Sequence, residues 1–263
     1  MSFEHILFDL NAGIAKLTLN RPKSLNSFNE AMHLEVRTAL DEVEASDECR
    51  VLLITGAGRG FCAGQDLSDR HVKPGDEAPD LGYTLDNFYN PLVRRLKALE
   101  MPVICAVNGV AAGAGANLAL AADIVLAARS AKFIQAFCKL GLIPDSGGTW
   151  ALPRLLGPAR AAGLALLGDA LNAQQAEEWG LIWRCVDDDE LPGAAESLCT
   201  HFASQPTRGL ALIKQALAAS WGHTLDEQLD LEKELQRTAG RTVDYKEGVS
   251  AFMEKRPATF VGR

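Results

Sequence analysis

Short apolar runs and helix-spaced apolar residues alternate along most of the chain. Residues 3–8 and 14–19 predict two strands, and the Asn-Ala-Gly sequence at 11–13 between them is typical of a hairpin turn. Continuous apolar runs predict three further buried strands, at 51–55, 103–107 and 124–127. Strands that alternate with helical segments predict an α/β fold.

Apolar residues at helical spacing predict the intervening helices, at 29–44, at about 85–99 and from a run of small residues near 113. From about Ala194 onward the pattern is almost wholly helical. Leucines stripe one of these later helices, at Leu225, Leu229, Leu231 and Leu235. The sequence therefore predicts an α/β core over residues 1–193 and a helical region over 194–263.

Composition narrows the class of protein. The net charge of −8 over 263 residues argues against a broad nucleic-acid surface. The six cysteines form no Cys-x-x-Cys pair and have no zinc spacing, which predicts free thiols and no metal site. The N-terminus lacks the basic segment of a signal peptide, so we expect a cytoplasmic protein. The apolar stretch 103–128 is interrupted by Asn108, Asn117 and Asp123, which disfavours a membrane span.

Several catalytic motifs are missing from the sequence. The glycines at 56–60 do not complete a dinucleotide fingerprint, no P-loop sequence occurs, and Ser146 is not in a nucleophile elbow. The five histidines are scattered. Nicotinamide, metal and serine-hydrolase chemistry are therefore disfavoured.

Three segments rich in small residues could together build a site. The segment 61–67 allows a ligand close to the backbone, although alone a tight structural turn explains it better. The segment 108–117 could start a helix whose N–H groups stabilise an oxyanion, or could simply pack closely. The segment 141–150 holds Asp145, which taken alone is more typical of a helix cap than of a catalytic base.

Taken in order, these segments resemble the crotonase (enoyl-CoA hydratase/isomerase) superfamily over the full chain. The motifs that carry the resemblance are Asn-Arg-Pro at 20–22, Phe-Cys-Ala-Gly-Gln-Asp-Leu at 61–67, Asn-Gly at 108–109 before the small residues, Gly-Leu-Ile-Pro at 141–144 with Gly-Gly-Thr at 147–149, and Phe-Met-Glu-Lys-Arg at 252–256. The resemblance implies a spiral of β-β-α units with a helical C-terminal trimerisation region, assembled as a homotrimer or a dimer of trimers.

The resemblance also implies a site. The family stabilises a thioester enolate with two backbone N–H groups, which would be those of Gln65 and Ala114. Acyl-CoA would lie along two segments, and a neighbouring subunit would add a lysine; the residues implied are Lys23, Leu25, Ala63, Gln65, Asp66, Leu67 and Lys255. Coenzyme A enters as part of the substrate, so no separate cofactor is expected.

Departures from the hydratase pattern indicate the reaction. The two positions where hydratases carry catalytic glutamates hold Asn117 and Phe137, which we expect to lie at the pocket, and Asp145 stands where hydratases usually have glycine. A single carboxylate is suited to moving a proton between two carbons and so shifting a double bond. Hydration, or dehalogenation of an aromatic acyl-CoA by an aspartate nucleophile at this position, remain alternatives within the superfamily.

Three features resemble the family's isomerases of phenylacetate degradation: the segments 88–95 and 139–145, and Trp150. These enzymes convert ring-1,2-epoxyphenylacetyl-CoA to oxepin-CoA, and the resemblance also implies a shift of 3-enoyl-CoA to 2-enoyl-CoA double bonds. A non-catalytic acyl-CoA-binding partner is the alternative from another class. The polar segment 68–82 is a candidate lid.

Overall fold

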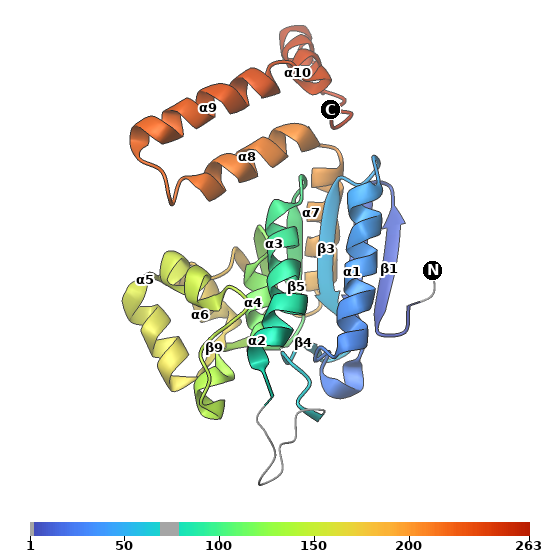
Figure 1. Ribbon diagram of the computed structural model, residues 1–263. Helices are drawn as coiled ribbons and strands as arrows, with labels where there is room; N and C mark the ends of the chain where they lie inside the picture. Colours follow the sequence, from blue (N-terminus) through green and yellow to red (C-terminus); the bar gives the residue numbers. More distant parts are fainter. Residues whose placement is uncertain (1–2, 69–78) are drawn as a thin grey trace.

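The chain enters its main sheet through a hairpin. A computed structural model describes residues 3–68 and 79–263 (Figure 1). β1 (Ile6–Asn11) and β2 (Ile14–Leu19) pair antiparallel, with Asn11 opposite Ile14. Ala12 and Gly13 between them have φ values of 49° and 80°, the left-handed pair that a two-residue hairpin turn requires. The predicted hairpin is confirmed, with its first strand starting at Ile6.

The main sheet has six strands in the order β1-β2-β3-β5-β7-β10, parallel from β2 onward. Parallel strands are covered on both faces, so their sequences read as continuous apolar runs, and all five residues of β5 are buried. This explains why the inner strands were predictable from the sequence. The further strands of this sheet are β3 (Val51–Gly56), β5 (Val103–Val107), β7 (Ile124–Ala128) and β10 (Arg184–Val186).

A second sheet has four short strands in the order β4-β6-β8-β9. Consecutive strands alternate between the two sheets, because β3, β5 and β7 lie in the first and the strands that follow each of them lie in the second. Helices then return the chain for the next pair, which is the expected spiral of β-β-α units. The short strands are β4 (Gly60–Cys62), β6 (Val110–Ala112), β8 (Lys132–Ile134) and β9 (Ala170–Asn172).

Helices cover both faces of the main sheet. α1 begins after Asn29, whose side-chain oxygen accepts a hydrogen bond of 2.9 Å from the Met32 N–H, a standard N-cap. α7 (Leu191–Ala203) contacts β2, β3, β5 and β7. The other helical elements are η1 (Pro22–Ser24), α1 (Glu30–Ala45), α2 (Leu81–Thr84), the π-helix η3 (Leu85–Tyr89), α3 (Asn90–Ala98), α4 (Ala114–Leu120), η4 (Ala136–Leu140), α5 (Gly148–Leu167) and α6 (Ala173–Glu178).

Three helices gather at one end of the molecule, away from α2 and β4 (Figure 1). They are α8 (Thr207–Ala219), α9 (Leu225–Ala239) and α10 (Val243–Glu254). None of the residues of α9 is buried, so its leucine stripe does not belong to the core of the single chain. A division of the chain after residue 193 falls inside α7, three residues after that helix begins.

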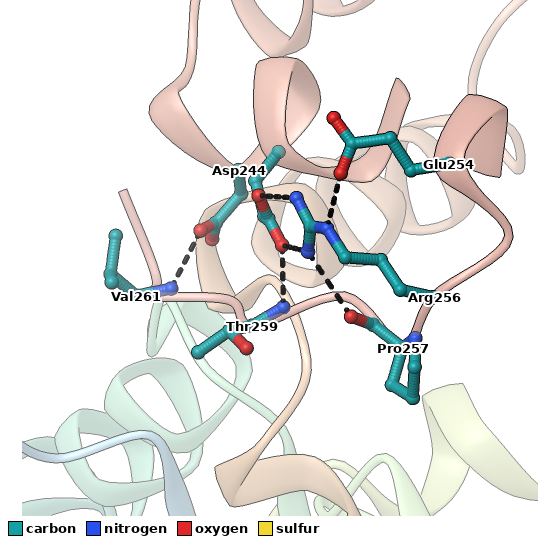
Figure 2. A network of polar contacts seen from close by, with 7 residues as sticks. Asp244, Glu254, Arg256, Pro257, Thr259 and Val261 are labelled. Atoms are coloured by element: carbon teal, nitrogen blue, oxygen red, sulfur yellow. Dashed lines mark hydrogen bonds and ion pairs between the residues drawn. The ribbon is translucent and has the colours of Figure 1, made fainter. Parts of the chain in front are cut away.

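The chain end folds back along α10 through the polar network of Figure 2. Glu247 accepts hydrogen bonds from Arg256, and the Arg256 Nε lies 2.6 Å from a carboxylate oxygen of Glu254. The buried Asp244 accepts a 2.7 Å hydrogen bond from the Val261 N–H. Hydrogen bonding to Arg256 lowers the pKa of Glu247 to about 2.

Other expectations have mixed outcomes. The helix expected at 85–99 is interrupted at its start, because 85–89 forms a π-helical turn before α3. All six cysteines are free thiols. No helix in the described part of the chain is both long and apolar enough to span a bilayer. Most of the lid candidate at 68–82 lies outside the described residues.

Candidate active site

Gly64 brings the segment after β4 against the start of α4. The Phe28 N–H donates to the Gly64 carbonyl at 2.8 Å, and the Asp66 N–H donates to the Phe28 carbonyl at 2.8 Å. These two bonds bracket Gln65 and, because successive N–H groups of an extended chain alternate in direction, turn the Gln65 N–H away from Phe28. A Cβ added to Gly64 would lie 3.4 Å from the Ala114 nitrogen, so the segment after β4 is in contact with the start of α4.

Ala114 is the first residue of α4, and every residue of this helix is buried. The first intrahelical hydrogen bond runs from the Asn117 N–H to the Gly113 carbonyl at 3.2 Å, so the Ala114 N–H has no acceptor within the helix. A Cβ on Gly115 would lie 2.3 Å from the Cys62 carbonyl oxygen, which shows how closely α4 approaches the end of β4. The two main-chain N–H groups expected to bind an oxyanion therefore come from segments in direct contact.

Asp145 lies in the turn before α5, but it does not cap that helix. The N-cap position is Gly147, which makes no side-chain capping bond. The Asp145 carbonyl accepts a 2.8 Å hydrogen bond from the Gly148 N–H, and the Ser146 hydroxyl donates to the Asp145 carboxylate at 2.8 Å. The Asp145 carbonyl therefore closes the turn before α5, and its carboxylate accepts from Ser146 without capping the helix.

These segments line one partly enclosed cavity of about 130 Å³. Most of its lining side chains are apolar, and Asp145 supplies the one carboxylate among the described lining residues. The cavity is lined by Ala63, Gly64, Gln65 and Leu67 after β4, by Leu81, Thr84, Leu85 and Tyr89, by Gly113 and Ala114, and by Ala136, Phe137, Leu140, Leu142 and Asp145.

Tyr89 is a polar residue of this cavity that sequence reasoning missed. It ends the π-helical turn η3, and its hydroxyl lies 3.1 Å from the Gln65 side-chain oxygen. Its ring packs on Phe28 with centroids 6.0 Å apart and is itself buried. Isolated π-helical turns are frequent at functional sites. The resemblance of segment 88–95 to the family's isomerases was a signal for this region, but it did not single out Tyr89.

The structure separates the expected site residues into two groups. Ala63, Gln65, Leu67, Ala114, Phe137 and Asp145 lie on the cavity. Asn117 lies behind it, 2% exposed, with its side-chain nitrogen 2.8 Å from the Asp145 carbonyl oxygen. Asn117 therefore contacts the turn that carries Asp145.

Four further expected residues lie off the cavity. The Leu25 carbonyl accepts from the Ala63 N–H at 2.9 Å, and Lys23 is exposed beside it. Asp66 pairs with Arg21 at 2.8 Å, and hydrogen bonds from Ser68 and the nearby Arg21 lower the pKa of Asp66. Lys255 directly follows α10, at the opposite end of the molecule from α2 (Figure 1).

The site offers no metal-binding cluster: within residues 3–68 and 79–263, no three His, Cys, Asp or Glu side chains are grouped as ligands. Cys62 lies beside α4, where burial raises the pKa of its thiol to about 12, so it is not a ready nucleophile. The arrangement can therefore offer two main-chain donors, one carboxylate and an apolar wall.

Known proteins resemble this chain over nearly its whole length. The model of the enoyl-CoA hydratase/isomerase family matches residues 9–263. A 1,2-epoxyphenylacetyl-CoA isomerase of Escherichia coli K12 is 62% identical over 260 residues, which cover 99% of each chain. A probable enoyl-CoA hydratase of Rhodobacter capsulatus is 45% identical over 263 residues and all of both chains.

A solved structure has the same fold. The enoyl-CoA hydratase of Bacillus anthracis superposes with a TM-score of 0.92 at 33% identity, covering 99% of this chain and 100% of its own. The match spans the C-terminal helices as well as the two sheets.

Proposed function

The chain belongs to the enoyl-CoA hydratase/isomerase family, and from this premise we propose that it isomerises ring-1,2-epoxyphenylacetyl-CoA to oxepin-CoA. The observation that carries the proposal is the cavity that Asp145, Gln65 and Ala114 line together. The name of the relative at 62% identity gives the substrate class. The same site would also shift 3-enoyl-CoA double bonds to the 2-position.

In the proposed reaction, the thioester oxygen accepts hydrogen bonds from the Gln65 and Ala114 N–H groups. Each such donor typically lowers the barrier by about 2.7–4 kcal/mol, because it stabilises the negative charge that develops on the oxygen. Asp145 removes a proton from the carbon between the thioester and the ring, and the electron pair enters the enolate. The ring carbon–carbon bond of the epoxide opens in the change from epoxide to oxepin.

Asp145 then returns its proton to a ring carbon, and a double bond forms in conjugation with the thioester. No atom is gained or lost and no electron acceptor is needed, which supports a reaction without any cofactor beyond the coenzyme A of the substrate. The 3-enoyl-CoA reaction uses the same two proton transfers on an open chain. One carboxylate acting first as base and then as acid is sufficient for both substrates.

Hydration is the second candidate, since a probable hydratase is 45% identical. Adding water needs groups that activate the water and protonate the α-carbon. The expected positions of those groups hold Asn117 and Phe137, whose side chains do not titrate, and this disfavours hydration.

The experiment compares the wild type with Asp145→Asn on a 3-enoyl-CoA in deuterated buffer. We expect the wild type to form the 2-enoyl product with some deuterium, and the variant to lose at least about 10²-fold in rate, the typical contribution of a general base. Both proteins should bind acyl-CoA and have the same assembly size. Normal turnover by folded Asp145→Asn would refute the proposal, and a hydroxyacyl product would favour the hydratase. Acyl-CoA binding without turnover of this substrate or the epoxide by the wild type would favour a binding partner.

We also propose that residues 194–263 form an oligomerisation region, as a homotrimer or a dimer of trimers in the cytoplasm. Large apolar side chains stay exposed on its helices, with Leu225 at 74%, Phe252 at 82% and Met253 at 75%. Two apolar grooves of about 490 and 510 Å³ lie among α8, α9 and α10. Lys255 would then contact the coenzyme A of a neighbouring subunit, with Lys23, Leu25 and Asp66 on the subunit that holds the acyl group. Light scattering tests the size of the assembly, and a Lys255→Ala variant tests the contact with coenzyme A.

A further inference from the structure

Asn117 is a buried polar residue for which the proposed reaction has no direct use. Its side chain joins two parts of the site: the nitrogen donates to the Asp145 carbonyl at 2.8 Å, and the oxygen accepts from the Gln135 side-chain nitrogen at 2.8 Å. We propose that Asn117, oriented by Gln135, is a positioning residue that sets the place of Asp145 relative to Ala114. This inference rests on the proposed role of Asp145 as the base.

The two hydrogen bonds fix one orientation of the Asn117 amide. The Asp145 carbonyl can only accept, so the nitrogen of Asn117 must face it, and the oxygen must then face the Gln135 nitrogen. Both side chains are buried, at 2% and 3% exposure. Water therefore does not compete for either bond, and the amide cannot turn without losing both of them.

Helix α4 fixes the distance between Ala114 and Asn117. Asn117 follows Ala114 by three residues, a spacing that puts the two residues on the same side of a helix. The first turn of α4 therefore begins with a proposed oxyanion donor, the Ala114 N–H, and ends with Asn117, which contacts the Asp145 turn. Any movement of the Asp145 turn relative to the Ala114 N–H must change the Asn117 hydrogen bond.

The turn that carries Asp145 is packed directly on this amide. A Cβ added to Gly148 would lie 2.3 Å from the Asn117 side-chain nitrogen, so no other residue fits there without displacing the turn. On its other side, Ser146 has a φ of 50° and donates to the Asp145 carboxylate. Asp145 is thus held through its main chain by Asn117 and through its side chain by Ser146.

Gln135 gives a second reason to assign a positioning role. Its side-chain oxygen is buried and has no hydrogen-bond partner among the described residues. An unpartnered buried acceptor costs free energy, so the bond from the Gln135 nitrogen to Asn117 has to offset the burial of that oxygen. The side chain is therefore better explained by its bond to Asn117 than by a contribution to stability.

Two substitutions of Asn117 separate its hydrogen bonds. Asn117→Asp keeps the shape and the acceptor for Gln135. Burial favours its neutral carboxyl, which can still donate to the Asp145 carbonyl, so this donor is lost only as pH rises through the pKa of the new carboxyl. Asn117→Leu removes both bonds. We expect Asn117→Leu, and Asn117→Asp at a pH where its carboxyl is ionised, to lower kcat by about 10²-fold with little change in KM, because a misplacement of about 1 Å has that effect on catalytic groups. Gln135→Met should lower kcat less, and should add little in the Asn117→Leu background because the two residues act in one chain.

The decisive measurement is the deuterium incorporated per product molecule when a 3-enoyl-CoA is isomerised in deuterated buffer. A displaced Asp145 returns its proton more slowly, so solvent exchange should rise in both Asn117 variants. A smaller folded fraction would lower the rate without changing this ratio. Glu35→Ala removes three hydrogen bonds from the main chain of residues 4–6 beside β1 and does not touch the cavity lining. It is the control that should lower Tm and leave kcat and the deuterium content unchanged.

Folded Asn117→Leu and ionised Asn117→Asp with wild-type kcat and deuterium content would overturn the inference. The same holds if kcat falls while the deuterium content stays at the wild-type level, because the loss would then not come from a displaced base. Asp145→Asn separates this failure from a failure of the proposed function. Loss of activity in Asp145→Asn with normal Asn117 variants rejects only the positioning role, and normal activity in Asp145→Asn rejects the proposed function.

Discussion

The replacement of Gly64 by alanine tests the proposed oxyanion site without touching a polar side chain. Gly64 has a φ of 92°, in the left-handed region that favours glycine. A Cβ there would lie 2.8 Å from the Ala112 carbonyl oxygen and 3.4 Å from the Ala114 nitrogen. Carbon and backbone oxygen atoms cannot stay that close, so the Gln65 segment must move away from α4.

Two separable effects follow from this movement. The left-handed conformation costs an alanine about 1–2 kcal/mol, which lowers the free energy of unfolding. Displacement of the Gln65 N–H removes one of the two proposed donors to the thioester oxygen, worth about 2.7–4 kcal/mol. We therefore expect Gly64→Ala to lower kcat/KM for isomerisation by roughly 10²- to 10³-fold, far more than partial unfolding would explain.

Gly180→Ala is the matched control. Gly180 has a φ of 80°, and the atom nearest to its Cβ position is the Leu155 carbonyl oxygen at 3.8 Å, an ordinary van der Waals contact. This variant should bear a cost for its positive φ and keep its activity, because Gly180 does not line the cavity. The assay is the rate of 3-enoyl-CoA isomerisation, followed by the absorbance of the conjugated product, together with Tm. If folded Gly64→Ala stays within threefold of Gly180→Ala, the Gln65 N–H is not an oxyanion donor.

Further predictions concern other parts of the chain. Tyr89→Phe removes the hydrogen bond to the Gln65 side chain, worth about 0.5–1.5 kcal/mol, and should lower kcat/KM by roughly 2- to 10-fold; unchanged kinetics would reject this role for the hydroxyl. Arg50→Met removes three hydrogen bonds to the C-terminal region and should lower Tm with unchanged kcat per assembled enzyme; an unchanged Tm would mean that they add no stability. The Glu247 pKa is lowered to about 2 by its hydrogen bond to Arg256, so the stability from this pair is present above pH ~4.5 and is lost as pH falls toward 2. Acid unfolding of the wild type should show this loss and Glu247→Gln should not; identical profiles would contradict it.

Long, fully buried elements could be predicted from the sequence, and short ones could not. The strands β3, β5 and β7 were predicted to within one residue, because a strand buried on both faces gives a continuous apolar run. The second sheet was not predicted, because its strands have only three residues each, too few to show a period. The π-helical turn at 85–89 was also missed, since its apolar spacing does not differ enough from that of an α-helix.

Within the candidate site, single residues were easier to select than their contacts. Asp145 stood out as a carboxylate between a proline and two glycines, but its neighbour Ser146 gave no signal that its hydroxyl would reach the carboxylate. Asn117 was expected at the pocket and lies behind it, because the direction of a side chain depends on how α4 packs. Gln135 had no recognisable pattern, since its contact with Asn117 joins residues 18 positions apart.

The leucines around the cavity affect how the Asp145 carboxylate exchanges protons, because they control its contact with water. Leu67, Leu140 and Leu142 line the mouth and are 52%, 58% and 40% exposed. An acyl group that covers them gains about 25 cal/mol for each Å² of apolar surface removed from water, and it also excludes water from the carboxylate. In the proposed reaction, a proton on Asp145 would then be returned to the substrate more readily than it is lost to solvent. The same apolar wall that supports binding therefore favours isomerisation over hydration, because hydration needs an ordered water at the place where the leucines exclude it.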